Sequence, residues 1–478
     1  MKKRLSIIGI AIIGAILLSF LGYCILSDSS IDGTLHQITN ADTVYTDSLS
    51  AVCDAQDMTL TISKTQETTV GEDVFLEITQ QTLSYTGIGT QNLRASVTET
   101  LSIDSFSAQI SEIFANGIGY VTVNDACFSG SVKPEEYQKR FAPAILLDAS
   151  LYGTVTGFDT GEDYRIQFAQ PTDAEAWAFD QSAAFVDAKG TAYVSYDGQL
   201  TKSIYALTCH RGNASVRLTY IVEINLSTPT ISLPVDTSKY APIEYLDGPR
   251  MLERATGYLL QADHVSAKYS DSIYFQAFGD ARTQEITLHT AADDSWSALV
   301  QTQTILTNDS KVGLDSQLQK TELFRDGIYQ SSTNGSELIG NNEITADDMH
   351  TYCKNQLIGT VMLPQYITGA RMEEIGSVLY ITFSASESFA PLVSSNVCQT
   401  LYQKPELLND MAQSNTTNTL VCYLELDKNL LLPVAAGINY DGTFTVEGVP
   451  YALRFKADQI YDVLSHTAHA EIDKAGAQ

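Results

Sequence analysis

The stretch Glu112-Ile-Phe-Ala-Asn-Gly-Ile118 returns 210 residues later as Glu322-Leu-Phe-Arg-Asp-Gly-Ile328. Four more pairs of similar segments keep the same order in the two halves of the chain, and the distance between partners grows along the sequence. The pairs are 55–59 with 262–266, 132–137 with 344–349, 165–168 with 380–383, and 193–200 with 423–430. A growing distance is expected when insertions accumulate in the loops of the second copy, so the sequence predicts a duplicated module.

Four prolines mark the connection between the copies: Pro229, Pro234, Pro242 and Pro249. Proline at this density is typical of an extended linker, and we place the boundary near Val235. The predicted divisions are a basic stub at 1–4, an apolar segment at 5–26, a linker at 27–40, module copy 1 at 41–235, module copy 2 at 236–465 and a polar tail at 466–478. A chain of 478 residues has room for two such cores of ordinary domain size.

Each copy is expected to begin with a helix and to continue mainly in strands. The helices are predicted at 41–53 and at 249–261, where Pro249 suits the first helical position. A further short helix opens at Pro134, with acidic residues in its first turn. Strands are predicted in copy one at 74–78, 93–103 and 118–123.

The last third of each copy is expected to be a strand meander. From Val216 to Ile224 apolar side chains alternate with mostly polar ones, which predicts a strand with one buried face and one largely solvated face. Tyr451, Leu453 and Phe455 alternate in the same way in copy two. Two-residue turns that tolerate positive φ are predicted at Asp197-Gly198, Gly212-Asn213 and Asp441-Gly442.

This order of elements resembles that of the LolA/LppX-type half-barrel lipoproteins. The segment Leu49-Ser-Ala-Val-Cys-Asp-Ala-Gln-Asp-Met58 is similar to the junction between the first helix and the first strand of that fold. The resemblance implies an α+β fold class: two tandem modules, each a curved antiparallel half-barrel sheet with helices on its concave side. It also implies that the concave apolar face can hold acyl chains, and a related module senses envelope stress.

The apolar inner-face residues are the predicted lining of a ligand site. They are Val216, Leu218, Tyr220 and Val222 in copy one, and Tyr451, Leu453 and Phe455 in copy two. The leading hypothesis is a non-enzymatic binding protein that holds a lipid or another apolar ligand. A closed core without a cavity is the alternative for these residues, and a structural or sensory module that contacts envelope proteins is the alternative function.

The apolar segment 5–26 follows Lys2, Lys3 and Arg4 and is long enough to cross a membrane. The basic residues before it are expected to stay in the cytoplasm, which places the rest of the chain outside. We predict a single-pass anchor in a bacterial cell membrane, with one transmembrane helix ahead of the two modules. Lipidation at Cys24 and cleavage as a secretory signal stay open as alternatives, and both also export the modules.

The composition and motifs argue against several classes of function. Acidic residues outnumber basic ones 57 to 28, for a net charge of −29, which disfavours nucleic-acid binding. The spacing of cysteine, histidine and carboxylate residues predicts no catalytic residue, no metal site and no cofactor. Cys209 and His210 are neighbours on a predicted strand and would point to opposite faces. A disulfide between Cys398 and Cys422 stays open.

Overall fold

The computed structural model describes residues 36–70, 73–140, 152–171, 184–211, 214–234, 236–262, 264–276, 280–292, 295–308, 316–386, 389, 416–428, 430–446, 449–463 and 468–476. The predicted stub, the transmembrane segment and most of the first linker lie outside these residues. So do Cys24, Cys398, Val235 and the Gly212-Asn213 turn. From His36 onward, no described helix is long and apolar enough to span a membrane.

The first half of the chain contains twelve strands and two helices within the described residues. They are β1 (His36–Ile38), α2 (Ala41–Asp54), β2 (Met58–Val70), β3 (Asp73–Thr86), β4 (Arg94–Ile103), β5 (Phe106–Ala115), β6 (Ile118–Val123), β7 (Ala126–Ser131), α3 (Pro134–Arg140), β8 (Tyr152–Asp159), β9 (Tyr164–Pro171), β10 (Ala184–Val194), β11 (Leu200–Arg211) and β12 (Ala214–Asn225). The helices predicted at 41–53 and from Pro134 are confirmed as α2 and α3.

The second half repeats this order. It contains β13 (Ala241–Pro242), α4 (Gly248–Gln261), β14 (Val265–Phe275), β15 (Asp280–Ala292), β16 (Trp296–Asn308), β17 (Ser316–Arg325), β18 (Ile328–Thr333), β19 (Ile339–Asn341), α5 (Ala346–Leu357), the 3₁₀ helix η3 (Pro364–Tyr366), β20 (Ile367–Ile375), β21 (Val378–Ala385), β22 (Thr416–Asp427), β23 (Pro433–Val446), β24 (Val449–Asp462) and α8 (Ala468–Gly476). The helix predicted at 249–261 is confirmed as α4, with Pro249 in its first turn.

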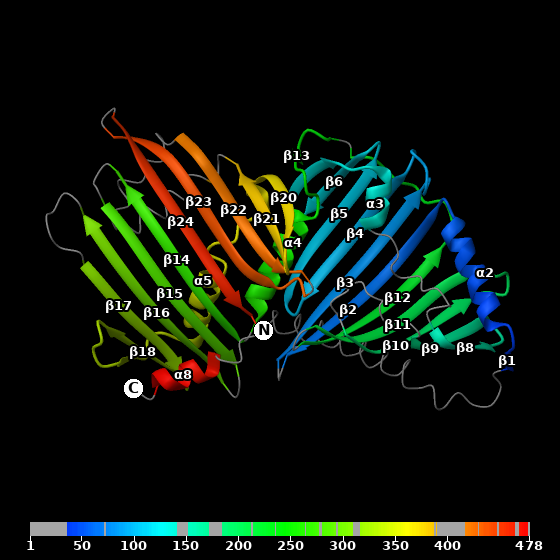
Figure 1. The fold of residues 1–478 in the computed structure, drawn as a ribbon, viewed down its shortest axis with the longest axis horizontal. Coiled ribbons are helices and arrows are strands. Elements are labelled where there is room, and N and C mark those ends of the chain that lie inside the picture. Colours follow the sequence, from blue (N-terminus) through cyan, green and yellow to red (C-terminus); the bar gives the residue numbers. More distant parts are fainter. Residues whose placement is uncertain are drawn as a thin grey trace.

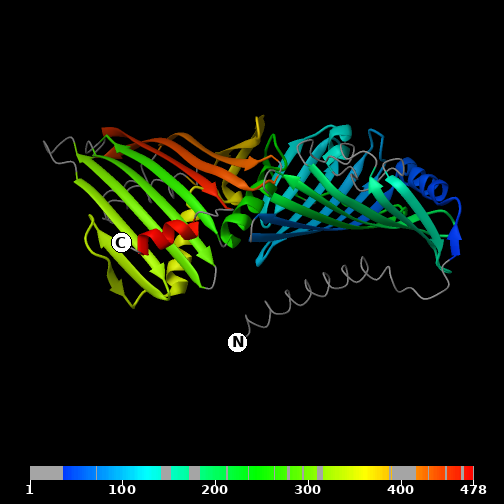
Figure 2. The same cartoon turned by 60° about the horizontal axis from the view of Figure 1, so that its bottom comes forward.

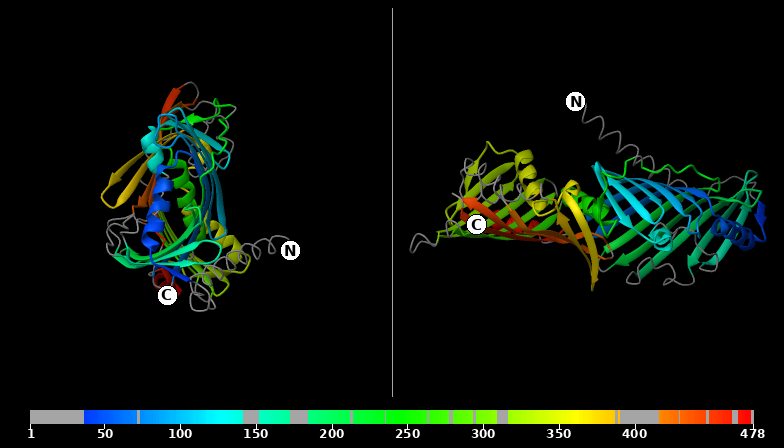
Figure 3. Two further views of the ribbon diagram at one scale, coloured as in Figure 1. Left: turned by 90° about the vertical axis from the view of Figure 1, so that its right-hand side faces the viewer. Right: turned by 90° about the horizontal axis from the view of Figure 1, so that it is seen from above.

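The two halves build two large antiparallel sheets with the same strand order (Figure 1). Sheet A has thirteen strands in the order β1-β8-β9-β10-β11-β12-β2-β3-β4-β5-β6-β7-β13, and sheet B has eleven in the order β19-β18-β17-β16-β15-β14-β24-β23-β22-β21-β20. When β1 and β13 are left out, each strand of sheet A has one counterpart in sheet B: the order from β8 to β7 in sheet A matches the order from β20 to β19 in sheet B. Each sheet curves around helices, as the view along the long axis shows for α2 (Figure 3). The structure thus has two large β-rich sheets, one in each half of the chain, and the module boundaries stay a prediction.

The segments that repeat in the sequence lie on equivalent elements. The turn between β5 and β6 places Asn116 and Gly117 at φ 54° and 76°, and the turn between β17 and β18 places Asp326 and Gly327 at 52° and 76°. Positive φ at both positions matches the right-handed twist of the hairpin strands, and asparagine, aspartate and glycine tolerate it best. The pair of turns therefore has one backbone geometry in both modules.

One predicted turn is wrong. Asp441 and Gly442 lie inside β23, opposite Arg454 and Leu453 of β24. Asp441 forms an ion pair with Arg454, with Nε and Oδ2 3.2 Å apart, and a Cβ atom at Gly442 would collide with the hydroxyl of Tyr440. The glycine therefore makes room for a core tyrosine, and the chain does not turn there.

The connection between the modules joins the two sheets edge to edge. β13 pairs in parallel with β7 of sheet A, and the Ile243 amide donates to the Ser129 carbonyl. The next link is to β20 of sheet B, where the Tyr245 amide donates to the Ala370 carbonyl at 2.8 Å. The segment predicted as an extended linker outside both cores is thus held by both sheets, and α4 follows it into the space between them (Figure 2).

The predicted polar tail contains α8, which packs on the outer face of sheet B. Ile472 is buried against Leu299 and Leu323, whereas His469 and Asp473 keep the exposed side polar and lie 3.2 Å apart. His289 on β15 lies near this helix and contacts Ser266, with the Ser266 hydroxyl 2.8 Å from Nδ1. Burial lowers the pKa of His289 below its ordinary value of 6.5, and Glu471 opposes this effect.

The lowered pKa of His289 predicts a loss of stability in acid. The unfolded chain takes up the proton first, so the free energy of unfolding should fall as the pH drops from about 6.5 through the lower pKa of the folded state. Urea unfolding at pH 7.5 and 5.5 measures the change. His289→Gln should remove part of this dependence.

Candidate functional site

The predicted lining residues lie on the inner faces of equivalent strands. Val216, Leu218 and Val222 of β12 are buried in the core of module copy 1, and Tyr220 is half-buried, with its ring stacked on Tyr205 at 4.8 Å. Leu453 of β24 is fully buried, and Tyr451 and Phe455 are half-buried against the same core. The prediction that these side chains face the core, which rested on the alternation of apolar and polar residues, is therefore confirmed. Whether these residues hold a ligand stays a prediction.

Helix α4 of module copy 2 covers the inner face of sheet A at the end where β4 turns into β5. Ile103 of β4 and Phe106 of β5 contact this helix at Gly257, where an added Cβ would lie 2.9 Å and 2.6 Å from their side chains. The buried cluster at this end contains residues of both modules, including Tyr258 and Leu259 of α4. Module copy 1 thus uses a helix of its neighbour to complete its core.

The same helix brings two arginines to a row of buried carboxylates on sheet A. Arg254 Nη2 lies 2.6 Å from Oε2 of Glu77, which also accepts a hydrogen bond from the hydroxyl of Tyr258 at 3.0 Å. Arg250 lies 3.3 Å from Glu99 and 3.6 Å from a third carboxylate, that of Glu112. Burial and the nearby Glu77 charge raise the pKa of Tyr258, so this phenol stays protonated and donates. The charges are paired across the boundary between the modules.

Module copy 2 has a different arrangement at the equivalent place. Its ion pair lies within sheet B: Arg282 Nη2 is 2.5 Å from Asp271 Oδ2, and both side chains are buried. The hydroxyl of Tyr269 donates to the same carboxylate oxygen at 2.8 Å. Strand register makes Asp271 the counterpart of Lys64 and Arg282 the counterpart of Glu77, so the signs of the cross-strand pair are exchanged. Sheet B balances its inner charges without a helix from outside.

Two leucines on the inner face of sheet B remain exposed. Leu306 of β16 is 40% exposed and Leu318 of β17 is 45% exposed, although alternation from the buried Ala298 and Phe324 directs both inward. Their counterparts in module copy 1, Ile103 and Ala108, are fully buried. In sheet B, Leu306 stands in the same cross-strand row as the predicted lining residue Phe455. We call this area the open inner end, defined by Leu306, Leu318 and Phe455.

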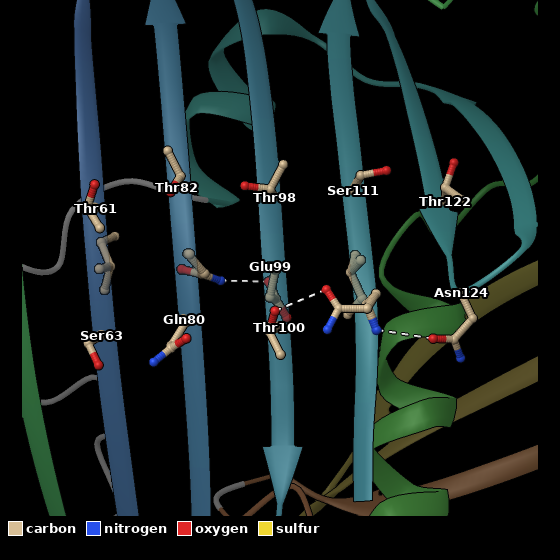
Figure 4. Close-up of a pocket in the computed structure, with 14 residues that line it drawn as sticks. Thr61, Ser63, Gln80, Thr82, Thr98, Glu99, Thr100, Ser111, Thr122 and Asn124 are labelled. Carbon is tan, nitrogen blue, oxygen red and sulfur yellow. Dashed lines mark hydrogen bonds between the residues drawn. The ribbon is translucent and has the colours of Figure 1, made fainter. Parts of the chain in front are cut away.

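A hollow of about 650 Å³ lies on the outer face of sheet A, across β2 to β6 (Figure 4). The outward side chains that line it are hydroxyls and amides: Thr61, Ser63, Gln80, Thr82, Thr98, Thr100, Gln109, Ser111, Thr122 and Asn124. None of these ten carries a charge. The Thr100 hydroxyl donates to Gln109 Oε1 at 3.0 Å, and the backbone N–H of Gln109 donates to Asn124 Oδ1 at 3.1 Å, so part of the surface is ordered by its own hydrogen bonds.

A second hollow, of about 940 Å³, lies where the two sheets meet. It is lined by residues of β6, β7, β13, β20, β21 and β22. Two of its lining residues, Arg371 and Glu244, form an ion pair with Nε and Oε2 2.8 Å apart, and both side chains are well exposed. An exposed pair of this kind contributes little to stability.

The reactive side chains show no assembled centre within the described residues. Within the described residues no disulfide joins the five cysteines, which are Cys53, Cys127, Cys209, Cys353 and Cys422. Burial raises the pKa of Cys422 to about 12. Cys209 is buried and His210 exposed, as predicted for neighbours on a strand. No group of three histidine, cysteine or carboxylate residues in the described ranges could hold a metal ion.

The comparisons with known proteins find similarity in structure only. No family model matches the sequence, and no curated protein matches it. LprF from Mycobacterium bovis matches with 10% identity and a TM-score of 0.25, over 41% of this chain and 97% of its own. A LolA superfamily protein from Nitrosomonas europaea matches with 7% identity and a TM-score of 0.13, over 45% and 91%.

A DUF1329 family protein from Desulfovibrio piger ATCC 29098 matches with 11% identity and a TM-score of 0.16, over 41% of this chain and 96% of its own. The chain is similar to LolA-like folds. TM-scores of this size are evidence on neither ligand nor activity.

Sequence reasoning missed the carboxylate row and its arginines. The signal was present: Glu77, Glu99 and Glu112 occupy positions of alternating strands where apolar residues are expected. Arg250, Arg254 and Tyr258 stand four residues apart and share one face of a helix. Their meeting could not be predicted, because it joins a helix of one module to the sheet of the other.

Proposed function

We propose that the chain is a membrane-tethered, extracytoplasmic, non-enzymatic binding protein of the bacterial envelope that holds an apolar ligand at the open inner end of module copy 2. In this proposal segment 5–26 is the anchor, Cys24 is the alternative attachment point, and the modules divide near Val235. The observation that supports the ligand site is the exposure of Leu306 and Leu318 on an inner face whose counterpart is covered.

The chemistry of the open inner end favours an occupant that is apolar where it contacts Leu306 and Leu318. In module copy 1 the equivalent surface holds α4, and three carboxylates there require its arginines. In module copy 2 Arg282 pairs with Asp271 and Lys320 pairs with Glu322, so these four inner-face charges of the described residues already have partners. An acyl chain needs only apolar contact, and each buried methylene contributes about 0.8 kcal/mol. The lining predicted in copy one, by contrast, is already packed core.

Labelling with a photoreactive fatty acid tests this proposal. Cells that express the full-length chain are fed an alkyne-bearing diazirine fatty acid and irradiated, and the label on the purified chain is quantified and mapped to peptides. Leu306→Glu combined with Leu318→Glu should lower the label on module copy 2 by about tenfold, because two carboxylates would face the acyl chain. Both leucines are exposed, so stability should change little.

Ile305→Glu is the matched control, because Ile305 is 36% exposed and lies next to Leu306 on the opposite face of β16. Its label should equal that of the wild type. Equal loss in this control, or label confined to module copy 1, would contradict the assignment to the open inner end. Absence of label from the wild type would favour the alternative function, an interaction or sensory module without a small ligand.

A further inference from the structure

Two continuous rows of uncharged side chains form the outward lining of the outer hollow of sheet A; Ile62, Gln81, Glu99 and Ile110 also border it, and the buried Glu99 carboxylate is paired with Arg250 on the inner side. The first row is Thr61, Thr82, Thr98, Ser111 and Thr122, one residue on each of five neighbouring strands in direct register. The second row is Ser63, Gln80, Thr100, Gln109 and Asn124, of which the last follows β6 in the turn. Hydroxyl groups form the first row, and amides mixed with hydroxyls form the second (Figure 4).

The sheet fixes the spacing of these groups. Neighbouring strands lie about 4.8 Å apart, so five strands spread the row over about 19 Å, and residues two apart on a strand are separated by about 6.7 Å. Threonine has few rotamers in a strand, so its hydroxyl loses little freedom when it binds. The surface therefore presents a preorganised array of groups that both donate and accept hydrogen bonds.

The charge of the site limits what it can bind. The chain carries a net charge of −29, so an anionic ligand would be repelled, and the rows offer no charged group to pair with a cation. The equivalent row of sheet B is Lys268, Thr287, Gln301, Thr321 and Ser332. There Lys268 pairs with Glu285 at 3.3 Å, so the neutral array is a property of sheet A alone.

We propose that the outer hollow of sheet A binds a neutral carbohydrate chain that lies across β2 to β6. Linked sugar rings present hydroxyls that both donate and accept, which matches the two rows. Flat apolar ligands would leave the threonine and glutamine groups without partners, and this mismatch disfavours them. This site lies on the outer face of sheet A, whereas the open inner end lies on the inner face of sheet B, so the two proposals are independent.

Binding of soluble hexasaccharides tests the proposal. The full-length chain in a detergent without a sugar headgroup is titrated with cellohexaose and with chitohexaose, and with an acidic hexagalacturonate for comparison. The wild type should bind at least one neutral hexasaccharide more tightly than the acidic one. Thr82→Val combined with Thr98→Val removes two hydroxyls at nearly constant shape and should weaken binding by about tenfold.

Thr287→Val combined with Thr321→Val makes the same change on the outer face of sheet B and should leave the affinity unchanged. Equal thermal unfolding of both double variants would show that the loss does not come from misfolding. Retention of the chain on purified cell-wall sacculi, abolished by Thr82→Val with Thr98→Val, would identify an envelope glycan, whereas binding of free oligosaccharide alone would identify a soluble one. Failure to bind either neutral hexasaccharide, or equal loss in both double variants, would overturn the proposal.

Discussion

Replacing Arg254 with leucine is expected to lower the free energy of unfolding by about 3–5 kcal/mol, the cost of leaving a buried charge without its partner. The charge left behind is Glu77, whose side chain is 2% exposed; among the described residues it would keep Tyr258 and the more distant Lys64 as partners. Lys64 Nζ lies 3.8 Å from Glu77, on the neighbouring strand. Urea unfolding monitored by circular dichroism measures the loss.

The control for Arg254→Leu is Arg454→Leu. Arg454 pairs with Asp441 at 3.2 Å, but its side chain is 67% exposed, and such pairs contribute about 0–1 kcal/mol. A loss of that small size for Arg254→Leu as well would mean that the carboxylate row is hydrated and carries no coupling between the modules.

A double change separates the charge from the packing. Arg254→Leu together with Glu77→Leu removes both buried charges and should recover most of the lost stability, because apolar replacement of a whole buried pair is often neutral. If the double variant is less stable than Arg254→Leu alone, the arginine acts mainly by filling space along α4. Recovery would show that the row of carboxylates is what makes module copy 1 depend on the helix of its neighbour.

The local structure of this chain could be predicted well from its sequence. The helices α2, α3 and α4 begin within a residue of the expected positions, and β6 matches the predicted strand 118–123. These features are set by residues close together in the chain: a proline in the first helical turn, or alternation of apolar and polar side chains. The five repeated segments also matched elements of one module with their equivalents in the other, in the correct order.

Features that depend on distant pairing could not be predicted. Asp441-Gly442 has the composition of a hairpin turn, but it lies inside β23 because the neighbouring Tyr440 is buried in the core and packs over Gly442. Lys64 and Glu77 in sheet A correspond to Asp271 and Arg282 in sheet B, with the charges reversed. This correspondence can be recognised only from the strand register of the two sheets. The threonine row of the outer hollow draws one residue from each of five strands, so no local pattern marks it.

Leu218→Glu tests whether the lining predicted in copy one is a ligand site or core, and its expected effect is large. Leu218 is 5% exposed on the inner face of β12 and belongs to the buried cluster of module copy 1. A glutamate there would lose the apolar contacts and bury a carboxylate opposite Gln66 and Leu207. Without a paired cation the cost is expected to reach about 4 kcal/mol or more.

The decisive comparison is between this variant and the pair at Leu306 and Leu318. Leu218→Glu should lower the midpoint of urea unfolding while the part that remains folded still takes fatty-acid label on module copy 2, because the open inner end lies in the other module. If Leu218→Glu instead unfolds at the wild-type midpoint and abolishes the label, module copy 1 contains the ligand site and its inner face opens in solution. Burial argues for the first result, because a ligand at Leu218 would have to displace side chains that already fill the sheet's concave face.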